Sequence, residues 1–105
     1  MGTGVRTKLA RTEIEDEEER WARGARTVLR ALRNDADLSQ EQLAARMGWT
    51  PRQVVNLESG RKAMQINYVV RYARALRIDP AVAFAQIVSW VQGQARRAPG
   101  RPTLR

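Results

Sequence analysis

The side chains in this sequence best suited to chemistry are guanidinium groups. Of the 19 basic residues, only Lys8 and Lys62 are lysine, and the rest are arginine. A guanidinium is planar and binds a phosphate or a guanine edge through two parallel hydrogen bonds. A GC-rich genome also favours arginine codons, so the preference for arginine over lysine has two explanations. Codon usage does not explain the excess of positive over negative charge.

One of these arginines, Arg52, lies four residues before an asparagine, Asn56. Such spacing places both on one face if the segment is helical. An arginine can pair with guanine, and an asparagine amide can pair with adenine, through two hydrogen bonds each. Val55 offers a methyl surface of the kind that contacts a thymine methyl group.

Charge is divided unevenly along the chain of 105 residues, whose net charge is +8. Residues 1–19 carry three basic and six acidic side chains, a net −3, whereas residues 20–105 carry sixteen basic and five acidic, a net +11. A positive body attracts polyanions. The acidic side chains of the first part form one run, Glu13–Glu19. We interpret this run as a solvated helix face, or alternatively as a shield over the basic surface until DNA competes for it.

Histidine and cysteine are both absent. Their absence excludes zinc sites of the Cys/His type, disulfides, Cys–His dyads and Ser–His–Asp triads. We therefore expect no enzyme activity, no metal, no cofactor and no small-molecule ligand. No apolar run approaches the roughly 18 residues of a membrane span, and the N-terminus lacks the apolar segment of a signal peptide. We expect a cytoplasmic protein that does not bind membranes.

Two short helices joined by a tight turn have the strongest local signals. Ser39 and Thr50 are each followed three residues later by a glutamine, which is the spacing of a capping box. Gly48 ends the first of these helices, and Pro51 suits the first position of the second because its missing N–H is tolerated there. The second helix is predicted over residues 51–58. A turn of about three residues makes the two helices cross steeply.

Apolar residues at helical spacing predict three further helices. The first begins with Thr12 as N-cap and ends near residues 34–37, with Gly24 marking a candidate break. Acidic residues before basic ones along it match a helix macrodipole. The others cover residues 66–76 and 80–92, with Gly93 ending the last. No strand pattern appears, so the predicted fold is all-α, a compact bundle of five helices.

Ten positions between residues 38 and 60 follow one ordered pattern: Leu38, Ser39, Gln40, Leu43, Ala44, Gly48, Trp49, Thr50, Glu58 and Gly60. This pattern resembles the helix-turn-helix of the phage repressor/Cro family, also called the xenobiotic-response-element (XRE) family. The resemblance covers roughly residues 27–85. It implies a five-helix domain whose third helix enters the major groove of DNA. The chain then divides into a flexible basic arm (1–11), an acidic-then-basic helical extension (12–26), the DNA-binding domain (27–93) and a disordered basic tail (94–105).

The resemblance also implies roles for individual residues. Arg52 and Asn56 fall on base-reading positions with Val55 beside them, while contact with phosphate alone is the alternative for Arg52. Arg33 and Glu58 are implied as an ion pair that orients the recognition helix; the alternative is two exposed charges. Candidate phosphate contacts are Ser39, Gln40, Thr50, Gln53, Ser59, Arg61 and Lys62. Capping alone is the alternative for Ser39 and Thr50, and a solvated loop is the alternative for Arg61 and Lys62.

The leading functional hypothesis is a regulator of transcription that binds double-stranded DNA. A homodimer on a palindromic operator is expected, with half-sites about 34–36 Å apart. The candidate dimer contact is an apolar patch on the last helix, formed by Ile87, Val88, Trp90 and Val91, and packing within the domain is its alternative. The second hypothesis is a protein-interaction module, such as an antitoxin, that binds a partner protein through residues 1–26 or 86–105.

Overall fold

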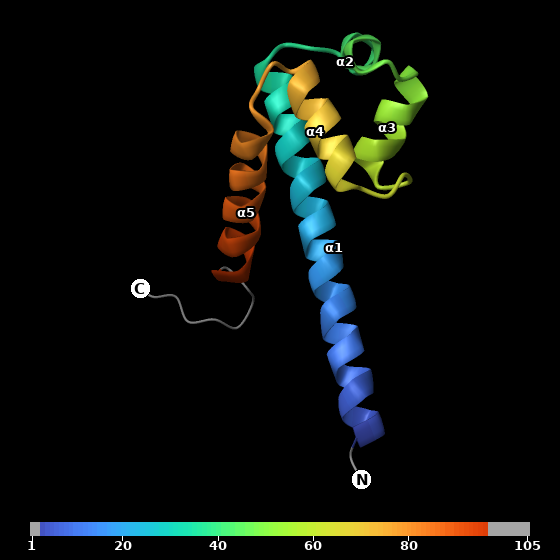
Figure 1. Cartoon of the computed structure of the whole chain (residues 1–105), viewed down its shortest axis with the longest axis vertical. Coiled ribbons are helices and arrows are strands. Elements are labelled where there is room, and N and C mark those ends of the chain that lie inside the picture. Colours follow the sequence, from blue (N-terminus) through green and yellow to red (C-terminus); the bar gives the residue numbers. More distant parts are fainter. Residues whose placement is uncertain (1–2, 97–105) are drawn as a thin grey trace.

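Helices make up the whole ordered architecture of the described chain. The computed structural model describes the backbone of residues 3–96 and the side chains of residues 11–94. Its helices are α1 (Thr3–Asp35), α2 (Gln40–Met47), α3 (Pro51–Ser59), α4 (Ile66–Ala75) and α5 (Pro80–Arg96), which are arranged as Figure 1 shows. The all-α prediction is confirmed, and so is the number of helices within these residues.

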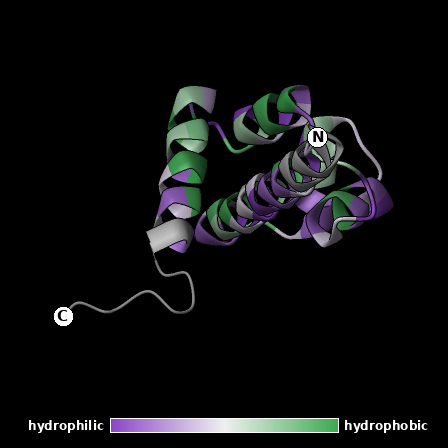
Figure 2. Ribbon diagram, turned by 90° about the horizontal axis from the view of Figure 1, so that it is seen from below, coloured by the Kyte–Doolittle hydropathy of each residue, from purple (hydrophilic) through white to green (hydrophobic). Residues whose placement is uncertain are grey.

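The C-terminal half of α1 forms the centre of the bundle. It contacts α3, α4 and α5, while α2 contacts α3 and α4. Each helix contributes to one core, whose buried members include Leu29, Leu43, Leu57, Tyr72 and Ile87. Figure 2, viewed from the N-terminal end of α1, shows how hydrophobic and hydrophilic residues are divided around the helices. The N-terminal half of α1 extends beyond the other helices (Figure 1).

α1 differs from its prediction in both start and continuity. Residues 3–11, for which we predicted a flexible arm, are helical, and Thr12 lies inside α1 rather than at its N-cap. The acidic run Glu13–Glu19 is therefore ten or more residues from the start of the helix, and the first turn of α1 contains no acidic residue. Because the macrodipole acts only within the terminal turn, it does not explain the acidic run, and that interpretation was wrong.

Gly24, the predicted break, lies within the continuous helix α1 at its crossing with α5. A Cβ built at Gly24 would lie 2.8 Å from the Trp90 ring and 2.9 Å from a Val91 methyl group. The glycine is therefore explained by the close approach of α5 and not by a helix end. α5 also continues through Gly93 to Arg96, so residues 94–96 of the predicted tail are helical. Residues 97–105 lie outside the described chain.

The connection from α2 to α3 agrees with its prediction residue by residue. Both capping boxes form: Ser39 caps α2 and Thr50 caps α3, each through the backbone N–H of the glutamine three residues on. Gly48 ends α2 with φ of 73°, in the left-handed region that favours glycine. The N–H of Trp49 then donates to the carbonyl of Ala44 at 2.9 Å. The turn therefore fixes where α3 starts relative to α2.

Candidate nucleic-acid interface

α3 buries one side and presents the other to solvent. Val54 and Leu57 have no exposed surface, so this side of the helix is anchored in the core. Arg52 and Val55 are exposed and Asn56 is half-buried. These three residues are the predicted base-reading set, and they lie on the outward side of a helix whose inner side is fixed.

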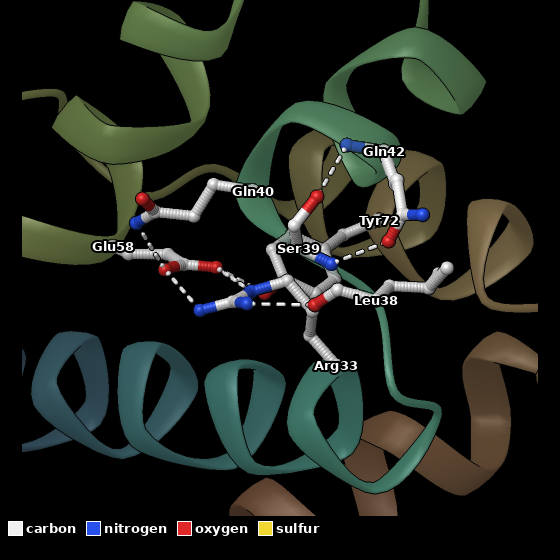
Figure 3. Close-up of polar contacts among 7 residues, drawn as sticks. All are labelled: Arg33, Leu38, Ser39, Gln40, Gln42, Glu58 and Tyr72. Carbon is white, nitrogen blue, oxygen red and sulfur yellow. Dashed lines mark hydrogen bonds and ion pairs between the residues drawn. The ribbon is translucent and has the colours of Figure 1, made fainter.

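The α3 helix is held at its C-terminal end by a buried carboxylate. Glu58 accepts hydrogen bonds from the Arg33 guanidinium at both oxygens, with N···O distances of 2.8 and 3.0 Å. The Gln40 amide donates to it at 3.0 Å, and the Tyr72 hydroxyl donates to its other oxygen. Arg33 donates in addition to the carbonyl of Leu38 at 2.8 Å. Figure 3 shows this arrangement, which we call the Glu58 cluster (Arg33, Gln40, Glu58 and Tyr72).

The Glu58 cluster joins four helices at one point. Arg33 comes from α1, Gln40 from α2, Glu58 from α3 and Tyr72 from α4. The predicted Arg33–Glu58 pair is present, and its two side chains are only 10% and 4% exposed. No buried side-chain nitrogen or oxygen in the described residues lacks a hydrogen-bond partner. Removing an ion pair from water costs free energy, and this cost is offset only when all the polar groups of the pair are hydrogen-bonded. The complete set of hydrogen bonds is therefore what makes the buried cluster stable.

Burial and hydrogen bonding act in opposite directions on the cluster. Burial alone raises the pKa of the Glu58 carboxyl, but hydrogen bonds from Arg33, Tyr72 and Gln40 outweigh it, and the net pKa lies below its ordinary value of 4.5. The bond to Glu58 raises the pKa of the Arg33 guanidinium. Burial, and then the bond to the Glu58 carboxylate, raise the pKa of the Tyr72 hydroxyl. The cluster therefore stays as a charged pair with a neutral tyrosine at neutral pH.

Sequence reasoning missed Tyr72. Tyr72 of α4 is fully buried, whereas Ile66 and Val70, which are apolar residues of the same helix, are 74% and 37% exposed. A tyrosine buried in a core needs a partner for its hydroxyl, and a buried glutamate needs donors. The matching needs of a buried tyrosine donor and a buried glutamate acceptor were the available signal. The two residues are 14 positions apart, so their pairing can be recognised only when the fold is known.

The predicted phosphate-contact residues have different environments. Ser39 and Thr50 cap their helices, as their alternative interpretation proposed. The Gln53 carbonyl accepts from the Thr50 N–H at 2.8 Å, and the Gln40 amide is bonded to Glu58. The Ser59 hydroxyl donates to the carbonyl of Asn56 at 3.2 Å. In each case the side-chain group is hydrogen-bonded at an end of α2 or α3.

Arg61 and Lys62 follow α3 and have different surroundings. Arg61 is exposed. The Lys62 ammonium lies 5.5 Å from the centre of the Trp49 ring and 5.1 Å from that of Tyr68. The two rings meet edge to face, with centres 5.1 Å apart. A cation over two adjacent aromatic rings is attracted to both, so Lys62 is not a freely solvated loop residue.

Most of the predicted dimer patch on the last helix packs within the chain itself. Ile87 and Val91 are buried in the core, and Trp90 packs on Gly24. Only Val88 of the four is exposed, at 37%. The close crossing at Gly24 brings this part of α5 onto α1, so these apolar side chains are covered within the chain. The alternative of packing within the chain is correct for the other three residues.

Within the described chain no helix is long and apolar enough to cross a membrane. Among the same residues no group of three or more acidic side chains is arranged to hold a metal ion.

The comparisons with known proteins agree with this geometry. A family model described as a helix-turn-helix domain matches residues 26–84. An uncharacterised HTH-type transcriptional regulator of Methanothermobacter thermautotrophicus is 41% identical over 51 residues, which cover 49% of this chain and 74% of that protein. No solved structure matches the chain. With two capped helices joined at Gly48 and a family match over more than half of its length, the chain belongs to the helix-turn-helix family of DNA-binding regulators of the XRE type.

Proposed function

We propose that this DNA-binding regulator reads double-stranded DNA sequence-specifically, with α3 in the major groove. The observation that carries the proposal is the outward side of α3, where Arg52, Val55 and Asn56 are accessible while Val54 and Leu57 anchor the helix. An α-helix fits the major groove, where each base pair presents a distinct pattern of donors and acceptors. The Thr50 capping box fixes the N-terminus of α3, and the Glu58 cluster holds its C-terminal end.

Each outward side chain has a proposed partner on the bases. Arg52 pairs with guanine O6 and N7, Asn56 pairs with adenine N6 and N7, and Val55 contacts a thymine methyl group. Pro51, at the first position of α3, has no donor to offer. Specificity therefore depends chiefly on Arg52 and Asn56.

Phosphate contacts are proposed for the two helix N-termini and for the segment after α3. Ser39 and Thr50 cap α2 and α3, and the free backbone N–H groups at a helix N-terminus bind phosphate. Gln40 and Gln53 position these ends, and Ser59, Arg61 and Lys62 lie next to the other end of α3. Lys62, held by its aromatic pair, offers an ammonium with little freedom to lose on binding.

We also propose that the protein acts as a homodimer on an approximately palindromic operator. Two copies related by a two-fold axis place two recognition helices about 34–36 Å apart along one face of the duplex, which matches one helical turn of DNA. We propose that it acts through occupancy of its site, and repression is the simplest form of such action. No catalytic step is part of the proposal.

Selection of bound sites from a random duplex pool tests the proposed function. We expect an enriched, approximately palindromic site. On that site Arg52→Ala weakens binding by about 1–3 kcal/mol and relaxes the preference at one base position. Arg74→Ala, which removes an exposed arginine from α4, is the matched control and leaves the preference unchanged. No enrichment, or an Arg52→Ala protein with unaltered preference, contradicts the proposal.

Salt dependence separates base contacts from phosphate contacts. Arg61→Ala is expected to weaken binding to all duplexes alike and to reduce the slope of log K against log salt by about one. Arg52→Ala is expected to change the base preference more than the slope. If the two variants behave alike, the division of labour between α3 and the segment that follows it is wrong.

A further inference from the structure

Two arginines on α1 bind one carboxylate oxygen beside the C-terminal end of α3. An oxygen of Glu19 lies 3.2 Å from a guanidinium nitrogen of Arg26 and 3.6 Å from a guanidinium nitrogen of Arg23. A guanidinium binds carboxylate and phosphate oxygens in the same way, through N–H donors in one plane. In this chain an internal carboxylate therefore occupies a position that is suited to a phosphate oxygen.

Arg26 packs against the backbone at the end of α3. A Cβ built at Gly60, the residue that ends α3, would lie 3.3 Å from the guanidinium carbon of Arg26. The last turn of α3 contains no basic residue, and the helix macrodipole favours a positive charge there. The side chain of Arg26 is 18% exposed and that of Arg23 is 60% exposed. The two arginines thus combine a group fixed on α3 with a group that is accessible from solvent.

This pair of arginines adjoins the proposed phosphate contacts that follow α3. Gly60, on which Arg26 packs, directly precedes Arg61 and Lys62. Arg30 is exposed and lies one helical turn after Arg26 on the same side of α1. Basic groups therefore continue from the end of α3 onto α1.

We propose that Arg23, Arg26 and Arg30 form a second surface for the phosphate backbone of DNA, on which a phosphate replaces the Glu19 carboxylate. The helix-turn-helix family match begins at residue 26, so this surface extends the interface beyond the two capped helices. Replacement costs little, because the Glu19 side chain is 54% exposed and an exposed ion pair is weak. The inference rests on the proposed function for its partner, which is duplex DNA.

Glu19 differs from its neighbours in the acidic run. Glu17 accepts a hydrogen bond from the Trp21 indole, and Glu18 lies with Trp21 at an apolar groove on another side of α1. Within the described side chains, Glu19 is the member of the run that forms ion pairs. Glu18→Gln and Glu19→Gln therefore change the net charge equally and at nearly the same place, but only the second substitution frees the two arginines.

Comparison of these two variants tests the proposal. We expect Glu19→Gln to bind duplex DNA about two- to fivefold more tightly than Glu18→Gln, because Arg23 and Arg26 no longer exchange a carboxylate for a phosphate. Fluorescence anisotropy of one labelled duplex, measured over a series of salt concentrations, gives both affinities. Equal affinities overturn the proposal, since a general effect of charge strengthens both variants alike.

Removal of the two arginines separates a phosphate contact from a structural role. In Arg23→Gln/Arg26→Gln the slope of log K against log salt is expected to become shallower by about one to two, and adding Glu19→Gln gives no further gain in affinity. Arg23→Gln alone changes an exposed side chain and replaces the double variant if circular dichroism shows a loss of helix. Arg74→Gln, on α4, is the control and keeps the wild-type slope. A gain from Glu19→Gln that persists without the arginines overturns the proposal.

Neutral phosphates identify the contact on the DNA. Each phosphate of the selected duplex is replaced in turn by a methylphosphonate. We expect at least one replacement to weaken binding by the wild type but not by Arg23→Gln/Arg26→Gln. If every replacement affects both proteins alike, these arginines do not contact the backbone and the proposal is overturned.

Failure of the proposed function has a different signature. In that case Arg52→Ala leaves the base preference unchanged, while Glu19→Gln still binds duplex DNA more tightly than Glu18→Gln. Equal binding by Glu19→Gln and Glu18→Gln, together with an altered base preference in Arg52→Ala, overturns only the inference about α1.

Discussion

The α2–α3 unit and the α1–α5 pair are held in place by different kinds of interaction. Ser39 caps α2, Thr50 caps α3, and the Glu58 cluster holds α3, all through directional hydrogen bonds. α5 is fixed on α1 by close apolar contact, with Trp90 and Val91 against Gly24. Directional bonds define the rotation of a helix about its axis, whereas close packing defines how near two helices lie. The helix proposed to read DNA is the one whose rotation is defined.

The largest expected effect comes from breaking the Glu58 cluster. Glu58→Gln leaves the Arg33 guanidinium buried without its counter-charge, and we expect a loss of about 3–5 kcal/mol in the free energy of unfolding, measured by chemical denaturation. Glu18→Gln removes an exposed carboxylate from α1 and is expected to change stability by less than about 0.5 kcal/mol. Similar values for the two variants would show that the cluster contributes orientation without stability.

A smaller effect, with a pH signature, is expected from Tyr72→Phe. This substitution removes one hydrogen bond to the Glu58 carboxylate, and we expect it to lower stability at pH 7 by about 1.5–3 kcal/mol. The pKa of Glu58 is lower in the folded chain than its ordinary value of 4.5, so the unfolded chain takes up the proton first as pH falls. The stability that depends on this carboxylate is present above pH 4.5 and is lost as pH drops through the folded pKa.

The pH series therefore distinguishes the variant from the wild type. Denaturation at decreasing pH is expected to bring the two proteins closer in stability, because protonated Glu58 no longer favours the tyrosine donor. A stability difference that stays constant down to acid pH would mean that Tyr72 acts through its packing and not through its hydroxyl.

The smallest expected effect tests the close approach of α1 and α5. Gly24→Ala places a Cβ within 3.0 Å of both Trp90 and Val91, so overpacking offsets the gain in helix propensity, and we expect a net loss of about 1 kcal/mol. Gly93→Ala is the matched substitution in α5, where a new Cβ meets nothing within 4 Å, and stability is expected to rise by about 0.5–1 kcal/mol. Stability changes of opposite sign for the two variants, measured by thermal or chemical unfolding, would confirm this difference between the two glycines. Changes of the same sign would contradict it.

Local features of the molecule were predictable because their signals lie within a few residues. Each capping box needs two residues three apart, and the αL position at Gly48 needs one glycine, so the start and end of α2 and the start of α3 could be predicted. The inward side of α3 followed from the spacing of Val54 and Leu57. The Arg33–Glu58 pair spans 25 residues and was predicted only through the family resemblance.

The sequence by itself thus determined the helical class, the turn between α2 and α3 and the residues that face outward from α3, since these depend on neighbouring residues and on periodicity. Tertiary structure decided that α1 is continuous, that Gly24 is a crossing point and that Tyr72 completes the Glu58 cluster. It also decided that Ile87 and Val91 belong to the core. Each of these outcomes depends on which distant segment fills a given space, because burial and shared hydrogen bonds are properties of the packed chain and not of a local pattern.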